Sequence, residues 1–242
     1  MWVSALGLQC SAVPDQQSPP APTAAPAGKV NPLGRARCQA PAGVTVTPGT
    51  IEESVQLLNA LPKPTSVACY VESLQRPLMA FATSSAFSAQ PALSTRSPRM
   101  FVKLDRLWLS IVIDGESSYL MEFGYLLEGE ELRSIKGELL LPISEPLPPS
   151  APYDRVRSNA GTVCGLCHFG EQRHDAIGFA EAYSSIAFRP RLQGQVSLET
   201  LRVEHQLCDW DAEPHRCEML SAVFDGGDVV EAPFPDSMLT FF

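Results

Sequence analysis

The chain has 242 residues, of which 45% are hydrophobic, and a formal net charge of −9. That length can bury a core in one large domain or in two small ones. The acidic balance argues against a nucleic-acid partner. The charge is also uneven: residues 161–242 hold 13 Asp/Glu and 5 Lys/Arg, whereas residues 1–160 hold 14 and 13. This asymmetry predicts two modules with different roles.

Residues 1–36 resemble a bacterial lipoprotein leader followed by its tether. A short apolar run, Met1 to Leu8, precedes Cys10, and a Pro/Ala-rich stretch without periodicity follows it. The resemblance implies a lipid anchor at Cys10 and a location in the periplasm or at the cell surface; the alternative is an unanchored, floppy tail. No later segment has the ~20 apolar residues of a spanning helix, so membrane attachment is expected only through this anchor.

Residues 37–147 are predicted to form a β-rich module. Thr50 and Glu53 make a capping box ahead of a helix over residues 51–61, which prolines end. Apolar residues then alternate with period two around 67–71, 100–104, 107–113, 119–123 and 135–141, with turn signals at Asp114-Gly115 and Gly129. The pattern indicates an antiparallel, sandwich-like sheet. It contains no His and no catalytic constellation, so a scaffold or recognition role is expected, carried by the long loop 83–97.

A proline-rich linker, residues 148–160, separates this module from residues 161–242. The second module reads as helical. Apolar spacing predicts helices over residues 167–188, 198–205 and 216–224, the last ended by Gly226-Gly227.

The pattern Cys164-x-x-Cys167-His168 is the arrangement that covalent haem attachment requires. On a helix the two thiols and the imidazole lie on one face, since positions i, i+3 and i+4 are neighbours. The thiols can then bond the two haem vinyl groups while His168 ligates the iron. On these residues the segment 161–242 resembles a mono-haem c-type cytochrome. The resemblance implies an α+β chain whose β-rich part is followed by a small all-α haem-binding module.

The resemblance also implies one covalently bound haem c and a sixth iron ligand. Met238, in a proline-bearing loop, is the first choice, and Met219 is the second, although its spacing also suits a core residue. His205 and His215 are further candidates. The implied function is an exported, non-enzymatic electron carrier whose acidic surface docks onto a basic redox partner. The haem propionates would be paired by arginines of the same module: Arg173, Arg189 and Arg191.

The other cysteines leave alternatives open. With Cys10 and the haem pair set aside, four cysteines remain. Pairing them in the order in which they occur in the chain gives the disulfides Cys38–Cys69 and Cys208–Cys217, although spacing alone does not fix connectivity. Such bridges fit an oxidising compartment. Alternatively, the CxxC pair could join Cys208 and Cys217 in an all-thiolate zinc site. A thioredoxin-like dithiol is disfavoured because no βαβ pattern surrounds the CxxC.

Two further functions remain open at this stage. One is a surface lipoprotein whose β module binds a ligand or partner, with purely structural cysteines. The other is a haem-based sensor or small peroxidase, which needs an open sixth position on the iron.

Overall fold

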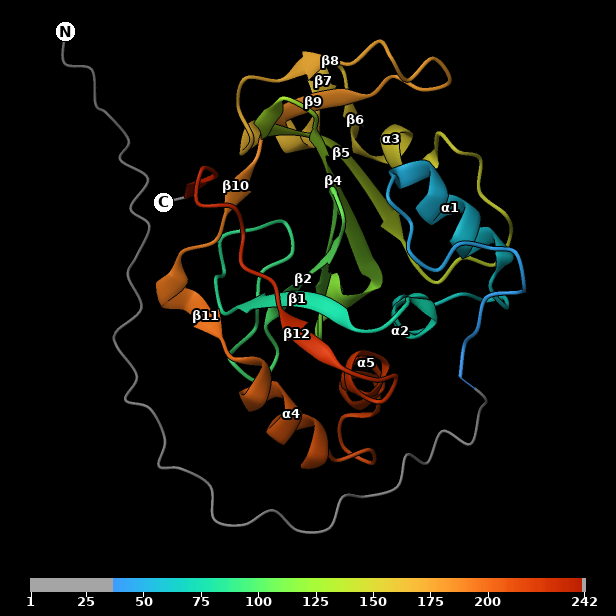
Figure 1. The fold of residues 1–242 in the computed structure, drawn as a ribbon, viewed down its shortest axis with the longest axis vertical. Helices are drawn as coiled ribbons and strands as arrows, with labels where there is room; N and C mark the ends of the chain where they lie inside the picture. The colour runs from blue at the N-terminus through green and yellow to red at the C-terminus, as the bar shows by residue number, and fades with distance from the viewer. Residues whose placement is uncertain (1–36, 241–242) are drawn as a thin grey trace, which may run out of the picture.

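The structure, a computed structural model, describes residues 37–240. Its centre is a bent, mainly antiparallel sheet, with helices packed along one side (Figure 1). The fold is therefore mixed α+β with a β-rich body, as predicted at that level. Within the described range, no helix has the length and apolar character needed to cross a membrane. The lipid-anchor prediction at Cys10 falls outside the described residues.

Helix α1 (Ile51–Ala60) forms where the capping signal predicts it. The Thr50 hydroxyl accepts a hydrogen bond from the Glu53 amide at 3.2 Å. The Glu53 carboxylate reaches one residue farther back than a capping box requires and accepts from the Gly49 amide at 2.6 Å. Ile51, Val55 and Leu58 are buried, so the helix packs its apolar stripe into the main core.

Helix α2 (Val67–Ser73) corrects the strand predicted for residues 67–71. Ser66 caps it by accepting from the Cys69 amide at 3.1 Å. Every residue of the helix except Glu72 is buried. A segment that is buried on all sides has no polar face, so the spacing of its polar and apolar residues does not distinguish a helix from a strand. The short alternation around Val67 and Val71 was therefore not evidence for a strand.

The sheet is built on five consecutive antiparallel strands, of which the alternation predicts the last four and misses the first. Gly129, at φ +71°, lies in the turn between the last two. The predicted tight hairpin at Asp114-Gly115 is longer than expected, because a 3₁₀ helix, η1 (Glu116–Tyr119), follows Gly115 before the chain pairs again. The five strands are β1 (Leu78–Thr83), β2 (Arg99–Leu104), β3 (Leu107–Val112), β4 (Leu120–Leu127) and β5 (Glu130–Leu140).

Residues after 160 extend both edges of the same sheet rather than forming an all-α unit, and the expected cytochrome-like helical module is not present. The helix predicted over residues 167–188 is replaced by short strands and loops. At one edge β9 (Tyr183–Ile186) pairs with β5, and β8 (Gln172–Arg173) pairs with β9. At the other edge β11 (Gln195–Val196) and β12 (Val229–Glu231) both pair with β1.

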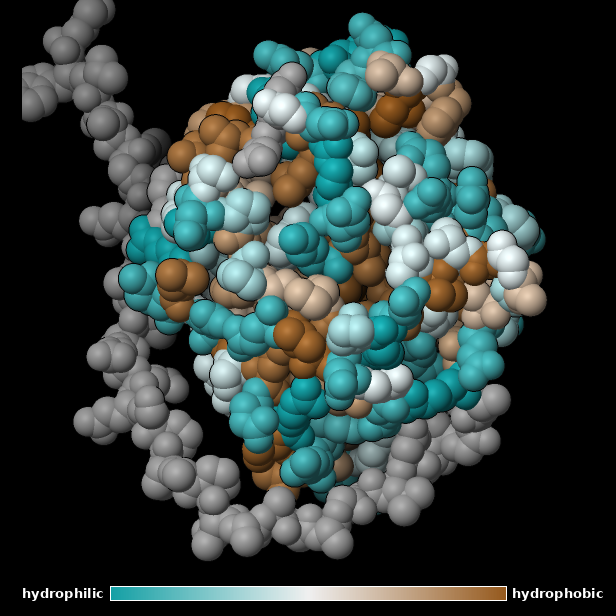
Figure 2. All heavy atoms as spheres, viewed as in Figure 1, coloured by the Kyte–Doolittle hydropathy of each residue, from teal (hydrophilic) through white to brown (hydrophobic). Residues whose placement is uncertain are grey.

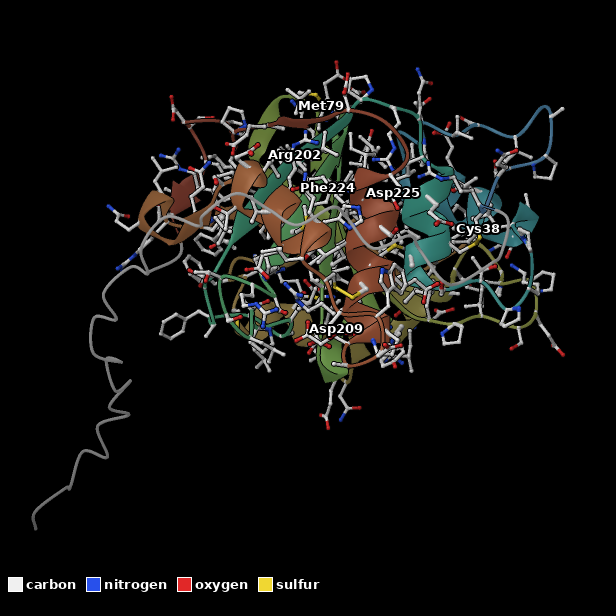
Figure 3. All side chains as sticks on the ribbon, turned by 90° about the horizontal axis from the view of Figure 1, so that it is seen from below. Cys38, Met79, Arg202, Asp209, Phe224 and Asp225 are labelled. Carbon is white, nitrogen blue, oxygen red and sulfur yellow. A yellow bond between two sulfur atoms is a disulfide. The ribbon has the colours of Figure 1, made fainter. Side chains whose placement is uncertain are left out.

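The remaining elements are short strand pairs, 3₁₀ turns and three helices. The predicted helices near residues 198–205 and 216–224 are present as α4 and α5, which lie beside each other and share the core with α2 (Figures 1 and 3). The bounds of all these remaining elements are α3 (Ala151–Val156), β6 (Arg157–Ser158), β7 (Gly161–Thr162), η2 (Val163–Leu166), β10 (Phe188–Arg189), η3 (Leu192–Gly194), α4 (Leu198–Gln206), α5 (Pro214–Phe224) and β13 (Leu239–Thr240).

The two faces of the sheet differ in chemistry. One face, including Ile135 and Leu139 of β5, belongs to the large core shared with the helices. Successive side chains of a strand point to opposite faces, so Ser134, Lys136 and Glu138 point to the other face. This second face carries polar residues at β4 and β5 and an aromatic cluster nearer β1, where Trp108 stacks on Phe234 at 4.2 Å.

Candidate functional site

The cysteine motif forms a tight turn at the end of the molecule that carries β7, β8 and β9 (Figure 1). Residues Val163–Leu166 make the 3₁₀ helix η2, closed by a hydrogen bond of 3.1 Å from the Cys167 amide to the Cys164 carbonyl. Cys164 is half-buried and Cys167 is exposed, and both are free thiols. The other four described cysteines form the predicted bridges Cys38–Cys69 and Cys208–Cys217.

The carboxylate of Glu171 stabilises this turn by hydrogen bonds. Glu171 accepts a hydrogen bond of 2.8 Å from the Thr162 amide and a second from the Thr162 hydroxyl. The carboxylate occupies the space that side chains would fill at two glycines: a Cβ on Gly161 would lie 1.9 Å from Glu171 Oε2, and one on Gly165 would lie 3.1 Å from it. Gly161 also has φ +131°, which only glycine adopts without strain. The glycines therefore allow the chain to fold tightly over Glu171.

The other end of the turn is tied to β9. His168 Nδ1 makes a hydrogen bond of 2.8 Å with the Ile186 carbonyl, and its ring packs against Phe188 with centroids 5.4 Å apart. Arg133 donates to the Gly170 carbonyl at 2.8 Å and to the Ser184 carbonyl at 2.9 Å. Segment 161–170 is thereby fixed against the β5–β9 edge of the sheet.

Lys136 of β5 lies on the polar face of the sheet close to Cys164. Its side chain is only 9% exposed, and its ammonium donates to the Ser134 hydroxyl at 2.7 Å. Burial lowers the pKa of Lys136 to about 8, and a charge on Cys164 or Glu122 opposes that shift. A lysine with such a pKa exchanges its proton near neutral pH.

Cys164 and Lys136 influence each other's protonation. Burial raises the pKa of the Cys164 thiol to about 11, whereas the Lys136 charge and a hydrogen bond with Thr162 act to lower it. Removing the proton from Cys164 thus becomes easier when a positive charge resides on Lys136. The pair places a protonated thiol beside an amine that can carry or release a proton.

His168 is a neutral structural group in this setting. Its pKa falls to about 3, chiefly through burial and then through the Lys136 charge, while the hydrogen bond to Ile186 opposes the shift. The imidazole therefore carries no charge at neutral pH. Its visible role is to close the turn after Cys167.

A polar network continues across the same face toward β2. Arg99 pairs with Glu122 at 2.6 Å and donates to the Ser110 hydroxyl at 2.6 Å, and Ser110 in turn donates to Gln90 at 2.7 Å. Burial lowers the Arg99 pKa, and the Glu122 carboxylate opposes that effect. These bonds pair the buried polar side chains of Arg99, Ser110 and Gln90 with one another and with Glu122.

The expected likeness to a mono-haem cytochrome c is wrong. Among residues 37–240 no group of His, Cys, Asp and Glu side chains is arranged to hold a metal ion. The motif sits on a four-residue 3₁₀ turn followed by strands, not on a long helix that could present Cys164, Cys167 and His168 along one face. The four-thiolate zinc alternative is also excluded, since Cys208 and Cys217 are joined to each other.

The other predicted ligands lie elsewhere in the fold. Met238 is buried in the aromatic cluster with Phe81, Trp108 and Phe234. Met219 is a fully buried core residue of α5. His205 pairs with Asp225 at 2.7 Å between α4 and α5.

His215 and the arginines are engaged separately. His215 Nε2 makes a hydrogen bond of 2.7 Å with the Ser118 hydroxyl. Arg173 pairs with Asp175 and Arg189 pairs with Asp236, at 2.9 and 3.0 Å, whereas Arg191 is exposed.

Sequence reasoning identified both free thiols but missed Lys136. A lysine on an alternating strand is normally a solvent-facing residue, whereas this one is buried in the fold. The chain matches no protein-family model, no curated protein and no solved structure.

Proposed function

We propose that this protein carries out thiol–disulfide exchange with a protein substrate at Cys167 and Cys164. The observation that supports this proposal is a free CxxC pair, one thiol exposed and one half-buried beside Lys136, in a chain whose other described cysteines are oxidised. The two disulfides favour an oxidising compartment, the periplasm or the cell surface, as the place of action.

The backbone of η2 suits an internal disulfide between the two thiols. In a 3₁₀ helix, residues i and i+3 are eclipsed and about 6 Å apart. Disulfides span Cα–Cα distances of roughly 4.4–6.8 Å. The two bridges already present in this chain have Cα–Cα distances of 5.2 and 5.6 Å. The Cα spacing therefore permits a Cys164–Cys167 bridge, provided that the turn tightens to bring the two Cβ atoms within the roughly 3.5–4.5 Å that a disulfide needs.

The reaction proceeds in two exchanges. The exposed Cys167 thiolate attacks one sulfur of a substrate disulfide, so that a bond forms from Cys167 to that sulfur and the second substrate sulfur leaves as a thiolate. The Cys164 thiolate then attacks Cys167 Sγ, closing the internal disulfide and releasing the first substrate sulfur as a thiolate. Two electrons pass from the protein dithiol to the substrate. A dithiol reductant restores the starting state by the reverse exchange.

Lys136 assists the second exchange. Cys164 must lose its proton before it attacks, and burial makes that loss difficult. The neutral amine of Lys136, populated near pH 8, can accept the proton, and the resulting ammonium stabilises the new thiolate. Cys167 is exposed, so a substrate disulfide can reach it from solvent.

Trapping of the intermediate tests this order of events. In the full chain carrying Cys10→Ser, so that only the CxxC thiols are free, Cys164→Ser should hold a stable mixed disulfide at Cys167 after reaction with 2-hydroxyethyl disulfide. The parent chain should instead end with a Cys164–Cys167 bridge, and Cys167→Ser should react slowly. Equal alkylation rates for both thiols, with no internal bridge in the parent, would contradict the proposal.

A further inference from the structure

We propose that the substrate of this site is a polypeptide whose disulfide is flanked by apolar side chains, which dock on Val163, Leu166 and Phe169. These three residues are called the apolar rim below. The inference deepens the proposed function and rests on it. It identifies the substrate class through the surface that surrounds the exposed thiol.

The apolar rim is unusually open to solvent. Val163 is 50% exposed, Leu166 is 88% exposed and Phe169 is 55% exposed. All three lie within three residues of a reactive cysteine, and Leu166 lies between the two. Figure 2 shows hydrophobic side chains among polar ones at the end of the molecule where Figure 1 places β7, β8 and β9. Exposed apolar side chains concentrated in one short segment indicate a binding site more often than scattered single residues do.

The local charge disfavours small charged disulfides as substrates. From Ser158 to Gly170 the sequence has no Asp, Glu, Lys or Arg. His168 is neutral. The charged groups around the turn are engaged: Glu171 with Thr162, Arg133 with carbonyls of the segment and of β9, and the buried Lys136 with Ser134. The two carboxylates that act on Cys164 are also paired, Glu122 with Arg99 and Glu138 with Arg155. A charged small disulfide would lose hydration here without gaining a partner, whereas apolar side chains gain by burial.

The rim is also held in place before a substrate arrives. The Glu171 carboxylate fixes one end of the turn, and the hydrogen bond from His168 to Ile186 fixes the other. Ordering a flexible loop lowers affinity, so a surface that is already fixed binds with a smaller entropic loss. The geometry thus joins a reactive thiol to a rigid apolar surface.

The test compares peptides in the full chain carrying Cys10→Ser. Two peptides, each with its cysteine capped as a mixed disulfide with 2-nitro-5-thiobenzoate, differ only in the flanking residues: Leu and Phe in one, Ser and Thr in the other. The apolar peptide should release the coloured thiolate about tenfold faster. Leu166→Ser with Phe169→Ser should remove this preference by slowing the apolar peptide to the rate of the polar one.

A matched control separates rim effects from general surface effects. Leu207 is 46% exposed at the end of α4, far from β7 in Figure 1, so Leu207→Ser should keep the preference. Equal rates for the two peptides, with normal reaction of 2-hydroxyethyl disulfide, would overturn the apolar substrate and leave the exchange activity standing. Failure of 2-hydroxyethyl disulfide to oxidise the pair would overturn both.

Discussion

Replacing Lys136 by Met tests whether the buried ammonium is kept for chemistry rather than stability. The pKa of this lysine falls from 10.5 to about 8 in the folded protein. Each unit corresponds to about 1.4 kcal/mol, so below pH 8 the charged lysine destabilises the fold by about 3 kcal/mol. Methionine removes this penalty but also removes the hydrogen bond to Ser134, worth about 1 kcal/mol. The free energy of unfolding at pH 7 should therefore rise by about 2 kcal/mol.

The effect should depend on pH with a definite sign. Between pH 8 and 10.5 the unfolded chain holds the lysine proton more tightly than the folded chain, so raising the pH stabilises the parent. The advantage of Lys136→Met should shrink across this range. Urea unfolding at pH 7 and pH 10, without reductant, measures both values. Lys103→Met, on the same face at β2, should change stability by less than ~0.5 kcal/mol.

Two outcomes would refute this reasoning. A variant less stable than the parent at pH 7 would mean that the ammonium is well solvated or well paired in the fold. A gain that stays constant to pH 10 would mean that the lysine does not titrate in this range. The same variant should close the Cys164–Cys167 bridge more slowly, so that mixed disulfide accumulates at Cys167 during the exchange reaction.

Three other substitutions probe the supports of the fold and the site. His168→Asn should reduce the loss of stability at acid pH. Because the pKa of His168 is about 3 in the folded protein, the unfolded chain takes up a proton that the folded chain does not. The parent should therefore lose up to about 1.4 kcal/mol of unfolding free energy per pH unit below pH 6.5, measured by urea unfolding. Gly161→Ala should displace Glu171 and lower stability by about 2–4 kcal/mol in thermal unfolding. Arg216→Met should cost about 3 kcal/mol by the same assay, because Arg216 is 2% exposed and bridges Glu204 and Glu213.

Each of these has a control. The control for His168→Asn is the parent chain measured over the same pH range. Gly178→Ala adds a Cβ to open space and should change stability little. Arg191→Met removes an exposed arginine and should be nearly neutral. A parent-like result for any of the three test variants would show that the contact described for it does not support the fold.

Local signals in the sequence predicted much of the fold. The cap at Thr50 placed α1, the period-two alternation placed β2 to β5, and the order-respecting pairing gave both disulfides. These features depend on short-range geometry or on patterns that one buried face imposes. They are therefore readable from the sequence without knowing the rest of the chain.

Segments whose structure depends on distant partners were misread. Residues 167–188 have helix-like apolar spacing, yet they form β8 and β9 because β5 offers an edge to pair with. Residues 67–71 alternate like a strand, yet they form α2 inside the core. In both cases tertiary contacts override a short periodic pattern.

In the candidate site, too, local features could be predicted from the sequence and contacts with distant residues could not. Cys164 and Cys167 were identified from spacing alone, but the likeness to a cytochrome drawn from them was wrong, because a CxxCH says nothing of whether a long helix carries it. The neighbour that changes the interpretation, Lys136, is 28 positions earlier in the sequence. Only the folded chain brings the two groups near enough to influence each other's protonation.

The reversible bridge between Cys164 and Cys167 can be measured directly. The full chain carrying Cys10→Ser is equilibrated in dithiol–disulfide buffers of increasing reducing strength, quenched with an alkylating agent and analysed by mass spectrometry after proteolysis. A single two-electron transition should occur for Cys164–Cys167 while Cys38–Cys69 and Cys208–Cys217 stay oxidised. Absence of that bridge at every buffer ratio, or its loss only together with the two other disulfides, would contradict a thiol-exchange function.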